Sequence, residues 1–176
     1  MKKIVLLAVA AMMATINVNA QDEFQNEISI AYGSGSNTDI VSSIGKGIFT
    51  GQQLDYWGPV SLEYFYRPQP KLGVGAVVAL AGCKWDDSSD SKSTYFSVMP
   101  AVKYNWLNKS HFSMYSKAAI GLTFAAQSGG SENKTDVVFN WQASLIGMEF
   151  GSAFRGFVEL GMGEQGIILA GLRYKF

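Results

Sequence analysis

The residue types that usually carry chemistry are scarce in this sequence. Its 176 residues contain one histidine, His111, and one cysteine, Cys83. Nucleophilic catalysis needs a base beside the nucleophile, and a structural zinc site needs about four Cys or His ligands. One histidine and one cysteine provide neither arrangement, so we predict no catalytic, cofactor-binding or metal site and no enzymatic activity. The acidic segment with Asp86, Asp87 and Asp90 is interpreted as a solvated loop.

Charge is also scarce, and it is balanced. The chain has 14 Lys and Arg against 14 Asp and Glu, and charged residues make up 16% of it. Soluble domains usually contain about 25% charged residues. No basic cluster accompanies the zero net charge, which argues against nucleic-acid binding. A lone cysteine excludes a disulfide scaffold.

The first 20 residues have the layout of a targeting segment. Lys2 and Lys3 precede an apolar run from Ile4 to Ala14, and Val18 and Ala20 are spaced as in a cleavage site. A basic start, a short apolar run and such a site define a secretory signal peptide, which is too short to cross a bilayer as a helix. We predict a cleaved signal peptide over residues 1–20 and a single domain over residues 21–176.

The rest of the chain alternates between apolar and polar residues with a period of two. In residues 60–67, apolar side chains occupy the even positions, whereas Ser61, Glu63 and Arg67 occupy odd ones. In a strand the two sets lie on opposite faces. The pattern recurs in eight segments of about 8–16 residues, closer to the length of membrane strands than to that of ordinary globular strands. The segments are residues 24–33, 60–67, 71–85, 93–106, 111–126, 137–149, 155–162 and 167–176.

The two faces of these predicted strands differ in charge. One face is aliphatic and aromatic and has no charge in mid-strand, since Lys84 and Glu149 fall at strand ends. A soluble lipocalin-like barrel would turn this face inward, and a membrane barrel would turn it outward. In a membrane barrel the charges of the other face point into the lumen and must pair with one another. That face carries Glu27, Glu63, Arg67, Lys103, Lys117, Glu159 and Arg173.

Aromatic residues gather at both ends of the apolar face, which favours the membrane alternative. Belts of this kind mark the two membrane interfaces, and unpaired backbone cannot face lipid. The sequence therefore predicts an all-β fold, a closed eight-stranded antiparallel up-and-down transmembrane β-barrel. The group near the short connections is Tyr66, Tyr104, Trp106, Phe112, Tyr174 and Phe176. The group near the long connections is Tyr32, Trp57, Trp85, Phe96, Phe124, Phe139 and Trp141.

Three local features extend this prediction. Ile40, Ile44 and Ile48 share one helical face, which indicates a short helix within residues 37–50, either lying on the barrel rim or contacting a ligand. Pro100 removes a ladder donor in mid-strand, so we expect a bulge there. A hairpin turn at residues 164–165 would make Glu159 and Arg173 near neighbours.

With these features the chain resembles the small OmpA/OmpX-type outer-membrane β-barrel family of Gram-negative bacteria. The resemblance rests on the signal peptide, the eight amphipathic strands and the C-terminal strand. In that strand Gly171, Tyr174 and Phe176 are similar to the terminal insertion signal of the family. The resemblance implies a location in the cell outer membrane, contact with outer-membrane lipid and lipopolysaccharide, insertion by the barrel-assembly machinery and a monomeric state.

An eight-stranded barrel has a lumen just wide enough for side chains, so the inward charges predict a salt-bridged plug. We expect a structural or surface-interaction protein whose extracellular loops meet an unknown extracellular ligand, with no nucleic-acid partner. The alternatives are a small pore for limited solute passage, a lipid A-modifying barrel enzyme and a secreted soluble lipocalin-like barrel. The enzyme alternative needs a base at the outer-leaflet end, whereas His111 falls beside a short connection.

Overall fold

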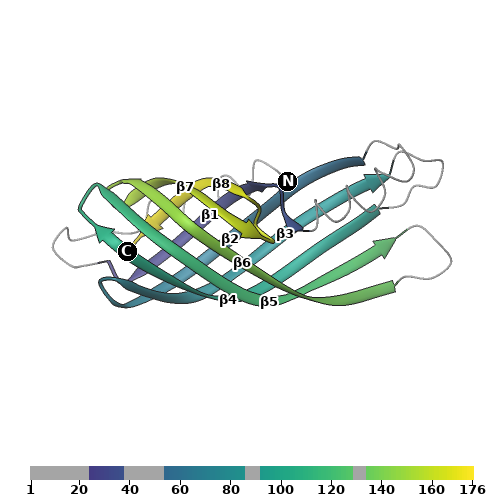
Figure 1. Cartoon of the computed structure of the whole chain (residues 1–176), viewed down its shortest axis with the longest axis horizontal. Coiled ribbons are helices and arrows are strands. Elements are labelled where there is room, and N and C mark those ends of the chain that lie inside the picture. The colour runs from purple at the N-terminus through teal and green to yellow at the C-terminus, as the bar shows by residue number, and fades with distance from the viewer. Residues whose placement is uncertain (1–23, 38–53, 86–91, 129–133) are drawn as a thin grey trace.

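Eight antiparallel strands form a closed barrel in which strands adjacent in sequence are adjacent in space. The computed structural model describes residues 24–37, 54–85, 92–128 and 134–176 (Figure 1). The predicted signal peptide, residues 38–50 of the predicted helical segment and the acidic segment at residues 86–90 lie outside this described part. The strands are β1 (Asn26–Ser34), β2 (Leu54–Gln69), β3 (Leu72–Trp85), β4 (Lys92–Asn108), β5 (Phe112–Ser128), β6 (Lys134–Gly151), β7 (Phe154–Gly163) and β8 (Ile168–Lys175).

The barrel closes between its first and last strands. Ile30 of β1 lies opposite Leu62 of β2 on one side and opposite Leu172 of β8 on the other. Each strand therefore has two paired neighbours, and the middle of the sheet has no free edge. The predicted fold class is confirmed.

The strands turn their apolar side chains outward. In β1, Ile28, Ile30 and Tyr32 are 39%, 53% and 55% exposed, whereas Glu27 and Ser29 are buried. Each of the other strands also exposes large apolar side chains. A soluble lipocalin-like barrel has the reverse arrangement, so that alternative is wrong. Within the described residues, no helix is long and apolar enough to cross a bilayer.

Aromatic side chains mark the two ends of the barrel. We call the end with the short connections β2–β3, β4–β5 and β6–β7 the turn end, and the opposite end the loop end. At the turn end the rings of Tyr174 and Phe176 stack with centroids 5.8 Å apart. At the loop end the rings of Phe96 and Phe124 lie 6.3 Å apart. These pairs belong to the two aromatic groups that the alternation places on the outer face.

Pro100 does not produce the expected bulge. It lies opposite Ala76 of β3, and the register of β4 against β5 is the same on both sides of it. The missing N–H interrupts the ladder at one point only, because the neighbouring pairs hold both strands in place. A proline does accompany an irregularity in β2, where the register against β3 shifts around Pro59.

A bulge in β6 changes the face of one charged residue. The register of β6 shifts around Leu145 against both neighbouring strands, and Leu145 and Ile146 are both exposed. Strict alternation assigns Glu149 to the apolar face, but the extra residue turns it inward, where it is fully buried. The assignment is wrong because a period-two pattern cannot show an inserted residue.

The strands end at different heights at the loop end. β1, β7 and β8 have 9, 10 and 8 residues, whereas β2 to β6 have between 14 and 18. Figure 1 shows β2 to β6 continuing beyond the hairpin of β7 and β8. The wall is therefore lower on one side, at the position where β7 turns into β8.

Candidate functional site

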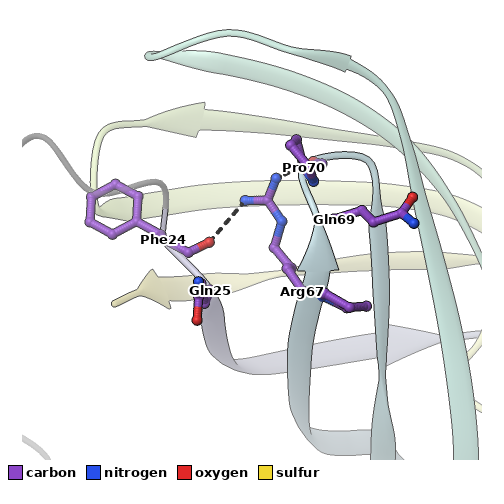
Figure 2. A pocket seen from close by; sticks show the side chains of 6 residues that line it. Phe24, Gln25, Arg67, Gln69 and Pro70 are labelled. Carbon is purple, nitrogen blue, oxygen red and sulfur yellow. Dashed lines mark hydrogen bonds between the residues drawn. The ribbon is translucent and has the colours of Figure 1, made fainter.

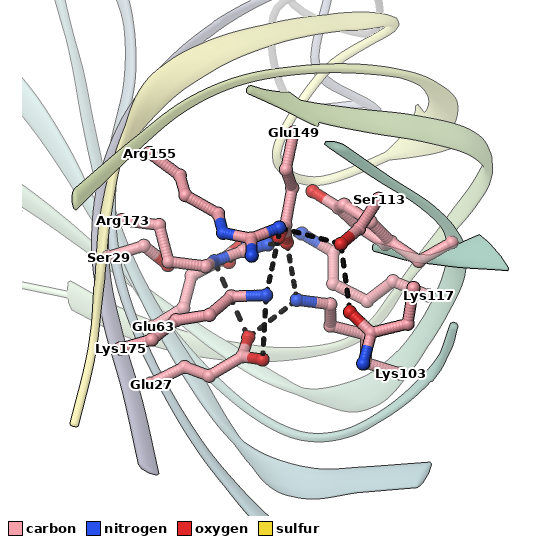
Figure 3. A network of polar contacts seen from close by, with 12 residues as sticks. Glu27, Ser29, Glu63, Lys103, Ser113, Lys117, Glu149, Arg155, Arg173 and Lys175 are labelled. Carbon is pink, nitrogen blue, oxygen red and sulfur yellow. Dashed lines mark hydrogen bonds and ion pairs between the residues drawn. The ribbon is translucent and has the colours of Figure 1, made fainter. Parts of the chain in front are cut away.

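The barrel interior holds a cluster of charged side chains, called the charge network below (Figure 3). Its members come from every strand except β3, and each is at most 6% exposed. They include all seven residues that the alternation assigns to the lumen. The members are Glu27, Glu63, Glu149, Glu159, Arg67, Lys103, Lys117, Arg155, Arg173 and Lys175.

Arg173 lies at the centre of the charge network. Its Nη2 is 2.8 Å from Glu63 Oε2 and 3.8 Å from Glu159 Oε1. Its Nε is 3.7 Å from Glu27 Oε2, and its Nη1 pairs with Glu149. One guanidinium thus contacts four carboxylates from four strands. The contact with Glu159 agrees with the proximity predicted from the hairpin.

Two lysines divide the same glutamates between them. Lys103 and Lys117 are direct partners across β4 and β5, an arrangement in which like charges repel. Lys103 Nζ lies 2.5 Å from Glu27 and 2.6 Å from Glu149. Lys117 Nζ lies 2.5 Å from Glu63 and 2.8 Å from Glu159. Each ammonium therefore has its own pair of carboxylates, which offsets the repulsion.

Tyr115 lies buried in the lumen beside these cations. Its ring centroid is 4.3 Å from Lys103 Nζ and 5.1 Å from the guanidinium carbon of Arg173. Its hydroxyl donates a hydrogen bond of 2.6 Å to Glu159. Gly147, its partner on β6, leaves room for the ring, since a Cβ there would lie 2.4 Å from Tyr115 Cζ. The ring is held by cation–π contacts and by packing against the backbone of Gly147, which has no side chain.

Two clusters of buried apolar side chains also lie within the described lumen. The ring centroid of Phe65 is 5.9 Å from Lys103 Nζ, and that of Phe157 is 4.3 Å from the guanidinium carbon of Arg173. A barrel of eight strands leaves little more room than such side chains need. The clusters are Phe65, Val77, Met99, Ala101 and Ala119, and Ala31, Phe157 and Leu169.

Arg67 closes one side of the turn end. It lines a small pocket with Phe24, Gln25, Pro68, Gln69 and Pro70 (Figure 2). Its guanidinium donates to the carbonyl oxygens of Phe24, at 3.4 Å, and of Pro70, and its Nε lies 3.6 Å from a Glu27 oxygen. Arg67 therefore ties the segment before β1 to the β2–β3 turn.

Arg155 closes the other side of the turn end. It donates hydrogen bonds to the carbonyl oxygens of Ser110, at 3.0 Å, and Ser152, at 2.8 Å, and to the hydroxyl of Ser113, at 2.6 Å. It also lies 3.6 Å from Glu149. Two adjacent turns are thereby joined to the charge network.

The seven lumen charges predicted from the alternation do not include three members of the charge network. Arg155 and Lys175 stand at inward positions of the alternation, but at strand ends, where the pattern gives no indication that a side chain reaches the lumen. Lys175 Nζ nevertheless lies 2.6 Å from Glu149 Oε2. Glu149 itself carries no sequence signal, because its face is set by the bulge.

The residues of the predicted C-terminal insertion signal lie on β8 or directly after it. Gly171 faces the lumen beside Phe157, where a Cβ would lie 2.8 Å from the ring. Tyr174 and Phe176 are on the outer face at the turn end, stacked on each other. His111 is exposed at the same end and hydrogen-bonds to Ser110 at 3.0 Å. In the described part of the chain, no group of His, Cys, Asp and Glu could hold a metal ion.

Comparison with solved structures finds the same architecture in other proteins. The crystal structure of Ail, the attachment invasion locus protein of Yersinia pestis, matches with a TM-score of 0.51 and 18% identity over 88% of this chain and 100% of that one. Ail in complex with the heparin analogue sucrose octasulfate matches with a TM-score of 0.54, again at 18% identity, over 88% of this chain and 100% of that one. The N-terminal β-barrel domain of Pseudomonas aeruginosa OprF has a TM-score of 0.46 and 14% identity over 87% of this chain and 99% of that one. No protein-family profile and no curated protein matches the sequence.

The distribution of side chains and the fold define the class of this protein. A closed barrel that exposes aliphatic and aromatic residues and buries its charges is suited to lipid outside and to ion pairing inside. The chain is a transmembrane β-barrel with the fold of the small outer-membrane proteins, and its lumen contains a buried salt-bridge network.

Proposed function

We propose that this protein is a sealed outer-membrane barrel that acts through its extracellular end, as a structural or surface-interaction protein. The observation that carries the proposal is the filled lumen. Arg173 alone bridges carboxylates from β1, β2, β6 and β7, so side chains cross the barrel from wall to wall. A lumen occupied in this way leaves the outer ends of the strands and their loops as the surface for interaction.

The orientation follows from the connections. In outer-membrane barrels the short turns face the periplasm and the longer loops face outward. The turn end of this barrel is then periplasmic, with Arg67 and Arg155 closing it. The loop end is extracellular, and there β2 to β6 extend past β1, β7 and β8 (Figure 1). At the loop end β2 to β6 therefore form a sheet that extends further than the part of the wall made by β1, β7 and β8.

The pore and enzyme alternatives receive less support. A pore would require the buried ion pairs of Arg173, Lys103 and Lys117 to separate, and breaking such a pair in a low-dielectric interior is costly. A lipid A-modifying enzyme would require a base near the outer leaflet, whereas His111 lies at the turn end. We therefore propose a non-enzymatic role, in monomeric form, with insertion by the barrel-assembly machinery and contact with lipopolysaccharide.

A sulfated polysaccharide is the first ligand class to test. Ail, which has a similar fold, has been crystallised in complex with a heparin analogue. In this chain Lys84 and Lys92 are direct partners at the loop end of β3 and β4, and β6 begins with Lys134. We propose that these lysines supply positive charge for sulfate groups.

Single-channel recording tests the sealed state directly. The refolded protein is reconstituted in a planar lipid bilayer at neutral pH. We expect no steady open-channel steps, because the charge network occupies the lumen. Long-lived conductance steps in the native protein would contradict the proposal and support the pore alternative.

Attachment of cells separates the surface role from a purely structural one. Cells that display the native protein are compared with cells that display a variant lacking residues 38–50, on surfaces coated with heparin. Asn37 is retained because its amide lies 3.4 Å from the Asn140 side-chain oxygen. We expect the deletion to reduce attachment while the barrel remains folded. Equal attachment of both strains would exclude residues 38–50 as the contact.

A further inference from the structure

The connection between β7 and β8 folds into the lumen. Residues 163–166, called the inward turn below, are buried throughout, and the side chains of Glu164 and Gln165 are 1% and 0% exposed. Turns at a barrel rim are normally in water, so burial of two polar side chains at this position requires an explanation. Gly163 and Gly166 have φ values of +134° and +109°, a conformation that only glycine adopts without strain. The two glycines therefore permit the chain to bend inward.

The side chain of Glu164 spans the lumen. Its Oε1 accepts a hydrogen bond of 3.1 Å from Ser97 on β4, and its Oε2 accepts one of 2.7 Å from Asn140 on β6. In an eight-stranded ring, β4 is three strands from β7 and four from β8, so Ser97 lies on the far wall. Ser97 and Asn140 are also both hydrogen-bonded to Thr123 on β5. A polar layer thus closes the barrel beneath the raised part of β2 to β6.

The side chain of Gln165 points toward the charge network. Its Nε2 donates to Ser61 at 2.9 Å and to Glu63 Oε1 at 2.8 Å. Its backbone N–H donates to the side-chain oxygen of Gln142 at 2.8 Å. The contact with Glu63 makes the inward turn the link between the polar layer and the ion pairs of Lys117 and Arg173.

We propose that the inward turn is an extracellular cap of the lumen, held inside by Glu164 and Gln165 and forming an outer seal separate from the charge network. This inference rests on the proposed sealed barrel and names the part that seals it from outside. Displacement of the turn would open the lumen to water as far as Ser144 and Glu63. The charge network below would still block passage.

Thiol labelling tests the outer seal. Ser144 is 1% exposed and donates a hydrogen bond to Glu159, so it lies between the inward turn and the charge network. Ser144→Cys is introduced with Cys83→Ser, and a membrane-impermeant thiol reagent is added from the loop-end side. We expect slow labelling with the native turn and labelling about tenfold faster or more in Glu164→Ala/Gln165→Ala, since the open state is then more populated.

Matched controls keep the test decisive if the double variant folds poorly. Ser97→Ala/Asn140→Ala removes two wall partners of Glu164 while leaving the sequence of the turn intact, and it should also accelerate labelling. Ser113→Cys, which is buried at the turn end, should remain protected in every background because the charge network lies above it. Folding of each variant is verified by the mobility shift between unboiled and boiled samples.

The outcomes distinguish the cap from the sealed barrel itself. Equal labelling rates of Ser144→Cys with native and altered turns would show that the turn is no seal. Steady conductance that occurs only in the Glu164→Ala/Gln165→Ala variant would show that the charge network does not block passage by itself. The inward turn and the charge network would then not be two separate seals. Steady conductance of the native protein would instead refute the proposed sealed barrel, whatever the labelling shows.

Discussion

A buried guanidinium among four carboxylates dominates the lumen at the level of single residues. Arg173 is fully buried, and its removal would leave Glu27, Glu63, Glu149 and Glu159 with fewer cations nearby. A buried ion pair contributes little net stability compared with a well-packed apolar replacement of both partners. Loss of one partner is nevertheless costly, because the remaining charge is left without compensation. We therefore expect single substitutions in the charge network to cost more stability than replacement of whole ion pairs by apolar residues.

Arg173→Met is expected to lower the free energy of unfolding by about 3–5 kcal/mol, the range for a buried pair that loses one partner. Urea unfolding of the refolded protein in lipid vesicles measures the effect. The double variant Arg173→Met/Glu63→Gln should lose less than the sum of the two single changes, because the groups interact directly.

Lys71→Met is the matched control for this change, because Lys71 is an exposed cation at the turn end. It should alter stability by no more than about 0.5 kcal/mol. If Arg173→Met were as mild as Lys71→Met, the charge network would not be coupled to stability.

At the level of elements, the bulge in β6 determines which side chains reach the lumen. It turns Glu149 inward, where Lys103, Lys175 and Arg173 surround it. A bulge also releases a backbone carbonyl, which lipid cannot satisfy. The hydroxyl of Ser116 on β5 donates to the carbonyl of Leu145 at 2.6 Å. The bulge in β6 thus explains why β5 carries a polar residue, Ser116, on its outer face.

Ser116→Ala is expected to destabilise the barrel by about 1–3 kcal/mol, the cost of leaving a polar group without a partner where the surrounding lipid cannot hydrogen-bond to it. Ser116→Thr keeps the hydroxyl and should retain most of the native stability. Both variants are compared by urea unfolding in vesicles. Equal stability of the alanine and threonine variants would show that the carbonyl has another partner.

At the level of the whole molecule, the polarity of an ordinary globular protein is inverted. The lipid-facing surface is aliphatic with aromatic ends, and the charges are collected in a lumen that ion pairs fill. The termini of β1 and β8 meet at the turn end, where Asn26 and Phe176 exchange backbone hydrogen bonds of 2.8 Å and 2.9 Å. The predicted C-terminal signal is thus located where the pairing of β1 with β8 begins.

Phe176→Ala is expected to reduce the amount of folded barrel in the outer membrane of cells severalfold. Refolding of the purified variant into vesicles should remain close to native, because the proposed signal for the assembly machinery would not be needed there. Phe150→Ala is the control, since Phe150 is also an exposed aromatic residue at the turn end, 5.0 Å from the ring of Phe112. A defect of equal size in cells and in vesicles would assign Phe176 a role in stability alone.

The sequence by itself determined the features that depend on local periodicity. Alternation in each segment decides which face is apolar, and the number of segments and the requirement for paired backbone in lipid lead to a closed eight-stranded barrel. Glu63, Lys103, Lys117 and Arg173 could be placed in the lumen in this way, because each lies within a regular stretch of its strand.

Only the tertiary structure decided the features that depend on contacts between distant strands. The inserted residue at Leu145 reverses the face of Glu149, and nothing in the neighbouring sequence indicates it. The inward course of Glu164 and Gln165 depends on partners more than twenty residues away in the chain. Periodicity assigns a side chain to a face, but the register between strands and the space left in the lumen determine which groups meet.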